Sequence, residues 1–216
     1  MLADLQDLLK SIYALEMSHD INDFLVTDPQ VAEELDAGGR DIEEKLLIAE
    51  NGDEAEVSLY LARELVARLR ERDPRARLDG DNLADFWTAC EGVSHFTYYA
   101  WNAAANRPVT LLEMELQAEV DKFVATAALL DRQGERLPRG LHHWLFEMPR
   151  FDGRLSGEEL ERYRRANRYA SRFCRALAAR LAKGTGVEDL VRELRHFYRL
   201  TQPAKIEYIE GRTAAV

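Results

Sequence analysis

Apolar residues recur at three- and four-residue spacing along two neighbouring stretches in the middle of the chain, residues 83–105 and residues 111–130. This spacing places the apolar side chains on one face of a helix. Between the two stretches, Pro108 disfavours helical backbone in the residue before it. Thr110 with Glu113 then forms the S/T-x-x-E pattern that starts a helix. The pattern therefore predicts two long helices joined by a tight turn, which makes them antiparallel neighbours.

The remaining hydrophobic pattern predicts shorter helices and one β-hairpin around this pair. Residues 45–60 contain Asn51-Gly52, the residue pair that most strongly favours a two-residue hairpin turn. The residues after this pair alternate between apolar and polar. Six further segments have a helical pattern: residues 2–17, 28–35, 62–72, 141–148, 156–183 and 187–200. The sequence KIEYIE near the C-terminus, residues 205–210, has an extended pattern.

The predicted fold class is mainly α. We expect a helical single domain over residues 1–216, organised around the central antiparallel αα-hairpin, with a small β-hairpin near residues 45–60. A two-stranded ribbon is marginally stable alone. The β-hairpin should therefore lie against the helices.

A stripe of polar residues interrupts the apolar face of the first long helix. Glu91, His95, Tyr98 and Asn102 follow helical spacing and therefore share one face. In a short antiparallel helical hairpin, the residue numbers of two facing residues add up to a nearly constant value, the index sum, which is here about 215. Glu91 is thus expected to face the segment that begins at Lys122.

The second long helix carries carboxylates one turn apart, Glu115 and Glu119. The same index sum places Tyr99 opposite Glu115 and His95 opposite the turn of helix that carries Glu119. Glu119 lies beside an apolar stripe, and a buried carboxylate needs a charged or hydrogen-bonding partner. An imidazole can donate to it. The sequence therefore predicts a hydrogen bond between a buried His95 and Glu119.

Three interpretations of this polar group stay open. In the first, Glu91, His95, Tyr98 and Glu119 form a satisfied hydrogen-bond network between the helices. In the second, Glu91, His95 and Glu119 hold a divalent metal or perform acid–base chemistry, with Glu115 beside them. In the third, neighbouring aromatic residues line a small-ligand pocket: Phe96, Tyr98, Tyr99 and Trp101.

One spacing in the first predicted helix bears on the metal interpretation. Glu16 and His19 have the Glu-x-x-His spacing of di-iron helical bundles, which need two such motifs. A second motif is missing, since Glu91 and His95 are four residues apart. We therefore expect no cofactor, and keep a divalent metal as the alternative.

Composition favours a cytoplasmic protein without a membrane-spanning segment. Charged residues make up 31% of the chain, and the longest uncharged apolar stretch falls well short of the roughly 20 residues that a spanning helix needs. The N-terminal residues lack the basic and apolar regions of a signal peptide. Cys90 and Cys174 lie on apolar helix faces, where we expect reduced, buried thiols. Phosphate-loop, dinucleotide-binding and serine nucleophile patterns are absent from the sequence.

Charge is unevenly spread over the chain, although the net value is −10. Residues 1–56 hold sixteen Asp and Glu against three Lys and Arg, a balance of −13. Residues 162–205 hold twelve Lys and Arg against three acids, a balance of +9. Such asymmetry indicates an interaction surface. Four arginines of one predicted helix are the candidate surface for an anion or a partner: Arg164, Arg168, Arg172 and Arg175.

These observations leave three classes of function open. The sequence favours a non-enzymatic interaction or regulatory protein with a protein partner or self-association. The first alternative is a metal-dependent or acid–base helical enzyme centred on Glu91, His95 and Glu119. The second is nucleic-acid binding through the arginine-rich helix over residues 157–183, which the acidic net charge disfavours.

Overall fold

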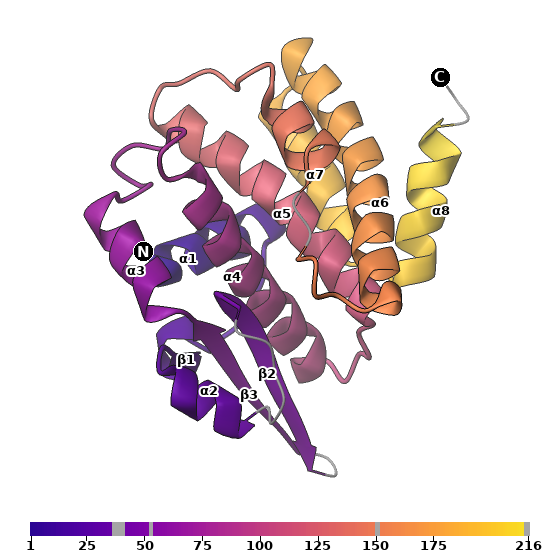
Figure 1. Ribbon diagram of the computed structural model, residues 1–216. Helices are drawn as coiled ribbons and strands as arrows, with labels where there is room; N and C mark the ends of the chain where they lie inside the picture. Colours follow the sequence, from indigo (N-terminus) through magenta and orange to yellow (C-terminus); the bar gives the residue numbers. More distant parts are fainter. Residues whose placement is uncertain (36–41, 52–53, 150–151, 214–216) are drawn as a thin grey trace.

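Two long antiparallel helices form the centre of the molecule, as the sequence predicts. The computed structural model describes residues 1–35, 42–51, 54–149 and 152–213. Helix α4 covers Leu83–Ala104 and α5 covers Leu111–Arg132. The Thr110 hydroxyl accepts a hydrogen bond from the backbone N–H of Glu113 at 3.1 Å, which caps α5. Figure 1 shows this pair with the β-hairpin on one side and the C-terminal helices on the other.

The predicted β-hairpin is present and belongs to a small sheet of order β1-β3-β2. Strand β2 (Glu44–Asn51) pairs antiparallel with β3 (Glu54–Leu61), with Leu46 opposite Leu59. The predicted turn at Asn51-Gly52 extends outside the described residues. A further strand that was not predicted, β1 (Leu25–Val26), pairs parallel with β3. Leu59 and Leu61 are buried, and the hairpin packs on α4.

The N-terminal helix ends earlier than predicted. Helix α1 covers Leu2–Tyr13, and Ala14 stops it with a left-handed backbone conformation, φ 51°. Two arginines of a distant helix donate to the free carbonyls at this end, Arg195 to Ile12 and Arg199 to Tyr13 and Ala14. These bonds satisfy carbonyl groups that a helix end leaves open. The elements that follow are η1 (Ile21–Phe24), α2 (Pro29–Leu35) and α3 (Arg63–Glu71).

The C-terminal part adds helices that cover α5 and α1. The first is a short π-helix, η2 (His143–Glu147), followed by α6 (Gly157–Ala182), α7 (Val187–Tyr198) and α8 (Gln202–Thr213). Ser156 and Glu159 form a full capping box at the start of α6. The predicted extended segment 205–210 is wrong, because it lies within α8. Lys205 and Ile209, one turn apart, turn the same side of α8 inwards and are buried.

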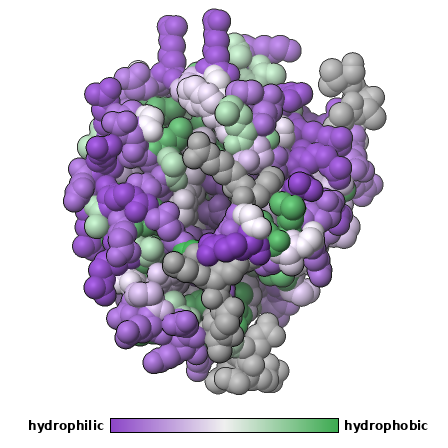
Figure 2. Space-filling view, viewed as in Figure 1, coloured by the Kyte–Doolittle hydropathy of each residue, from purple (hydrophilic) through white to green (hydrophobic). Residues whose placement is uncertain are grey.

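One connected hydrophobic cluster reaches from Leu2 in α1 to Ile209 in α8. Cys90 and Cys174 are buried free thiols, as expected. The face in Figure 2 is mostly hydrophilic, with hydrophobic residues in small separate patches. None of the helices in the described part of the chain is long and apolar enough to span a membrane.

Candidate metal centre

His95 lies at the interface of α4, α5 and the β-hairpin and is only 7% exposed. Its two ring nitrogens face different carboxylates. Nδ1 lies 3.4 Å from Oε1 of Glu44 on β2, within hydrogen-bonding distance. Nε2 lies 3.5 Å from Oε2 of Glu115 on α5, and this contact is electrostatic, because Nε2 has no hydrogen-bond partner. The imidazole therefore has a hydrogen-bond partner at Nδ1 and only an electrostatic contact at the buried Nε2.

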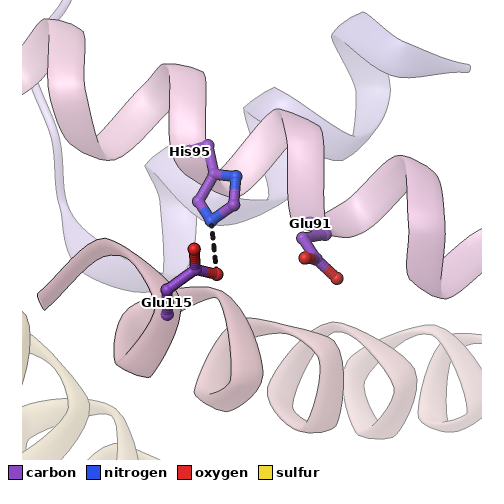
Figure 3. Close-up of side chains that lie close together, drawn as sticks. All are labelled: Glu91, His95 and Glu115. Carbon is purple, nitrogen blue, oxygen red and sulfur yellow. Dashed lines mark ion pairs between the residues drawn. The ribbon is translucent and has the colours of Figure 1, made fainter. Parts of the chain in front are cut away.

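Glu91 completes a group of three side chains on two helices. Glu91 lies one turn before His95 on α4, and the Glu115 carboxylate points towards His95 from α5 (Figure 3). Each of the three offers one ligand atom, and these atoms all lie within 4.8 Å of one another. Imidazole nitrogen with carboxylate oxygens on facing helices is the arrangement from which helical bundles build metal sites.

Lys122 occupies the neighbouring position and organises two further carboxylate contacts. Its ammonium donates to Glu91 at 3.0 Å and to Glu119 at 2.7 Å. Burial opposes the charged form, but Glu119 and Glu91 outweigh that effect and raise the pKa of Lys122. Arg162 of α6 approaches Glu115 from the other side, with Nε 3.8 Å from Oε1. The site thus contains two permanent cations at its edges.

Negative charge still exceeds positive charge within this group. The group contains four carboxylates and two basic side chains: Glu44, Glu91, Glu115 and Glu119, with Lys122 and Arg162. Its net charge is −2 when all four acids are ionised and His95 is neutral. Burial raises the pKa values of Glu44 and Glu119. Burial opposes the charged form of His95, but the nearby carboxylates of Glu115 and Glu44 raise its pKa well above the usual value. The group therefore attracts a cation or protons.

The structure corrects the predicted partner of His95. His95 is buried and next to carboxylates, as predicted, but these are Glu115 and Glu44 rather than Glu119. The predicted metal group of Glu91, His95 and Glu119 accordingly becomes Glu91, His95 and Glu115. The physical reason is Lys122, whose ammonium holds Glu119. The predicted position of Lys122 opposite Glu91 is confirmed, although its effect on Glu119 was not foreseen.

Tyr98 and Asn102 share the polar stripe but belong to a different part of the interface. The Tyr98 hydroxyl donates to Glu113 at 2.5 Å, and the Asn102 amide donates to the Tyr98 carbonyl at 2.8 Å. Tyr99 is partly buried against the hydrophobic core. Two residues of the predicted aromatic pocket pack against other rings: Phe96 on Phe24 at 4.9 Å and Tyr98 on Tyr198 at 4.9 Å between ring centroids.

A second buried network lies beyond Tyr98, centred on Lys205 of α8. Lys205 is 0% exposed, donates to the Gln117 side chain at 2.5 Å, and lies near the rings of Tyr98, Phe197 and Tyr198. Gln117 donates in turn to Asp121 at 2.9 Å. Burial lowers the pKa of Lys205 to about 7. Lys205 was not among the predicted site residues, because its segment was predicted as extended.

The other predicted candidates lie away from His95. Glu16 and His19 follow the end of α1 and are exposed, so they do not form a helical Glu-x-x-His site. The four arginines Arg164, Arg168, Arg172 and Arg175 are exposed on α6. Arg175 lies 3.4 Å from Glu147, whereas the first three form no ion pair with any residue that the structure describes. The described part of α6 thus presents a solvated basic face.

Comparison of the chain with protein-family models, with curated proteins and with solved structures finds no match.

Proposed function

We propose that this protein binds a divalent transition-metal ion between α4 and α5 through Glu91, His95 and Glu115. The observation that carries the proposal is the buried Nε2 atom of His95, which has no hydrogen-bond partner and faces the Glu115 carboxylate. A buried polar atom without a partner is costly, and such exceptions in folded proteins call for an explanation. A metal ion bound at Nε2 would supply that partner.

The chemistry of the three ligand atoms supports a transition metal. One imidazole nitrogen and two carboxylate oxygens suit zinc, manganese or iron, whereas calcium and magnesium favour oxygen ligands alone. Tetrahedral bonds of about 2.0–2.2 Å place ligand atoms about 3.4 Å apart. The three atoms already lie within 4.8 Å of one another, so small side-chain rotations bring them to ligating separation.

The site is also reachable from solvent at one edge. The side chains of Glu91 and Arg162 are 24% and 20% exposed, whereas His95 and Glu115 are largely buried. Three protein ligands leave a fourth position for water or a substrate oxygen, which is the pattern of metal sites that perform chemistry. Arg162 borders this edge. Its buried Nε has no hydrogen-bond partner and can donate to an oxygen bound there.

A titration of the metal-free protein with zinc and manganese ions, followed by calorimetry, tests the proposal. Glu115→Gln removes one ligand charge at nearly unchanged volume and should weaken binding at least about tenfold, since ligating carboxylates and their hydrogen-bonded neighbours each matter on that scale. Asp131→Asn, which removes an exposed carboxylate near the end of α5 and away from His95, is the matched control and should bind both ions like the parent. Failure of the parent protein to bind either ion, or equal loss in both variants, would refute the assignment.

We propose a second function for the basic face of α6, the binding of an anionic partner. Its support is the exposed row of Arg164, Arg168 and Arg172, which has no ion pair within the described residues. A protein surface of acidic side chains fits the net charge of −10 better than nucleic acid does, since nucleic-acid-binding domains usually carry net positive charge. The expected interaction or regulatory role, including self-association, stays a prediction.

A further inference from the structure

Glu44 reaches His95 from outside the central helix pair. It is the first residue of β2, and its side chain is 12% exposed. Its carboxylate lies 3.4 Å from Nδ1 of His95, the ring nitrogen opposite the one that faces Glu115. A histidine that ligates a metal usually donates its other ring N–H to a carboxylate or carbonyl, which fixes the tautomer and the ring orientation. Glu44 lies at the position of such an orienting carboxylate, next to Nδ1 of His95.

Gly92 explains how a strand residue comes this close to α4. A Cβ atom at position 92 would lie 2.9 Å from Cγ of Glu44 and 2.9 Å from Cδ1 of Leu59, with Oε1 of Glu44 at 3.1 Å. Separations below about 3.0 Å are essentially never seen for real Cβ atoms, so a side chain at position 92 would force the side chains of Glu44 and Leu59 to shift. Glycine inside a helix costs about 1 kcal/mol relative to alanine. Glycine at this position leaves room for the Glu44 side chain beside α4.

We propose that the β2–β3 hairpin contributes to the metal centre. In this proposal, Glu44 is the positioning residue that orients His95, and Gly92 leaves the space that the Glu44 side chain needs beside α4. This inference rests on the proposed metal binding. In the metal-bound state, Nδ1–H of His95 donates to Glu44, and the Nε2 lone pair points at the ion beside Glu115 and Glu91. Docking of the hairpin on α4 therefore favours metal binding.

The coupling must act in both directions, because linked binding equilibria are reciprocal. The backbone ties Glu44 firmly to the sheet: Glu44 pairs with Leu61 of β3, and the neighbouring Glu43 carbonyl accepts from the Ala62 N–H at 2.8 Å. A metal ion that holds His95 in the orientation that Glu44 prefers also holds the strand that carries Glu44. Binding of the ion should thus protect hairpin amides from hydrogen exchange, far from any ligand atom.

Metal titration and hydrogen exchange of the full-length chain test the coupling. Glu44→Gln keeps the side-chain volume and a weak acceptor but loses the charge, and should weaken zinc binding about 10- to 100-fold. Gly92→Ala should weaken it comparably by displacing Glu44. Because both act through one contact, their effects on the Kd should not add in the double variant. Glu56→Gln, an exposed position on β3, is the control and should bind zinc like the parent.

Hydrogen exchange supplies a readout that a purely structural role would not change. In the parent, zinc should slow exchange of backbone amides in residues 44–51 and 54–61, and this protection should be lost in Glu44→Gln. Parent-like zinc binding by Glu44→Gln would overturn the inference while leaving the metal site intact, provided that Glu115→Gln still loses binding. Additive effects of the two substitutions would overturn the role of Gly92. A parent that binds no metal would refute the proposed function and this inference together.

Discussion

Lys205→Met tests whether the buried lysine of α8 is neutral or charged in the folded protein. Methionine has a similar length and no charge, so it fills the space beside Tyr98 and Phe197 without an ammonium. Burial lowers the pKa of Lys205 from 10.5 to about 7, while the charges of Glu113 and Asp121 act in the opposite direction. This difference corresponds to a cost of about 5 kcal/mol for burying the protonated amine, at about 1.4 kcal/mol for each pH unit.

The direction of the pH dependence follows from the two pKa values. Between about pH 7 and pH 10.5 the unfolded state binds more protons at Lys205 than the folded state, so stability rises with pH in this window. From pH 7 to pH 9 the rise should be about 2 kcal/mol, because Lys205 is still half protonated at the lower value. Lys205→Met lacks this contribution. The free-energy difference between parent and variant should therefore change by about 2 kcal/mol over the same range.

Urea denaturation followed by circular dichroism at several pH values between 7 and 9 measures this difference. Lys183→Met, an exposed lysine at the end of α6, is the matched control and should leave the pH dependence of the parent unchanged. Parallel curves for parent and Lys205→Met would refute the reasoning. That result would mean that the surrounding rings and Gln117 stabilise the ammonium enough to offset its burial.

The remaining predictions concern three other positions. His95→Ala should lower the free energy of unfolding of the metal-free protein by about 1–3 kcal/mol in urea denaturation, because it leaves buried carboxylates without a partner; an unchanged midpoint would contradict this. Thr110→Ala should cost about 1 kcal/mol by removing the cap of α5, and Thr110→Ser should restore most of it. Reversal of Arg164, Arg168 and Arg172 to Glu should abolish any salt-sensitive association seen in sizing chromatography while keeping the melting temperature. Tight binding of a mixed oligonucleotide by the parent at low salt would instead identify nucleic acid as the partner.

The fold was predictable where periodicity extended over several turns or strand residues. The apolar spacing along α4 and α5 and the turn at Pro108 specify the central pair, and the pattern around Asn51 specifies the hairpin. Short elements were missed for physical reasons. Strand β1 has two residues, too few to show a period. The inward side of α8 carries a lysine, so its helical face does not read as apolar.

The candidate site was predictable in its location and only partly in its contacts. Index sums on an antiparallel pair place Glu91 opposite Lys122 and bring His95 to the carboxylates of α5. They do not decide between carboxylates one turn apart, because that choice depends on where a flexible lysine directs its ammonium. Glu44 could not be foreseen from helix spacing, since it comes from a strand about 50 residues away in sequence whose approach depends on Gly92.

The two buried polar networks between α4 and α5 differ in the property that separates a ligand site from a structural one. Hydrogen bonds link Lys205 to Gln117 and Gln117 to Asp121, and none of the described buried atoms without a partner belongs to these three residues. Around His95, the imidazole, Glu119 and Arg162 each have a buried atom without a hydrogen-bond partner. One edge of this group is partly exposed to solvent. A closed and satisfied network stabilises the fold, whereas an open one with excess negative charge can bind a cation. This contrast is the reason why we assign the proposed metal ion to His95 rather than to the network of Lys205.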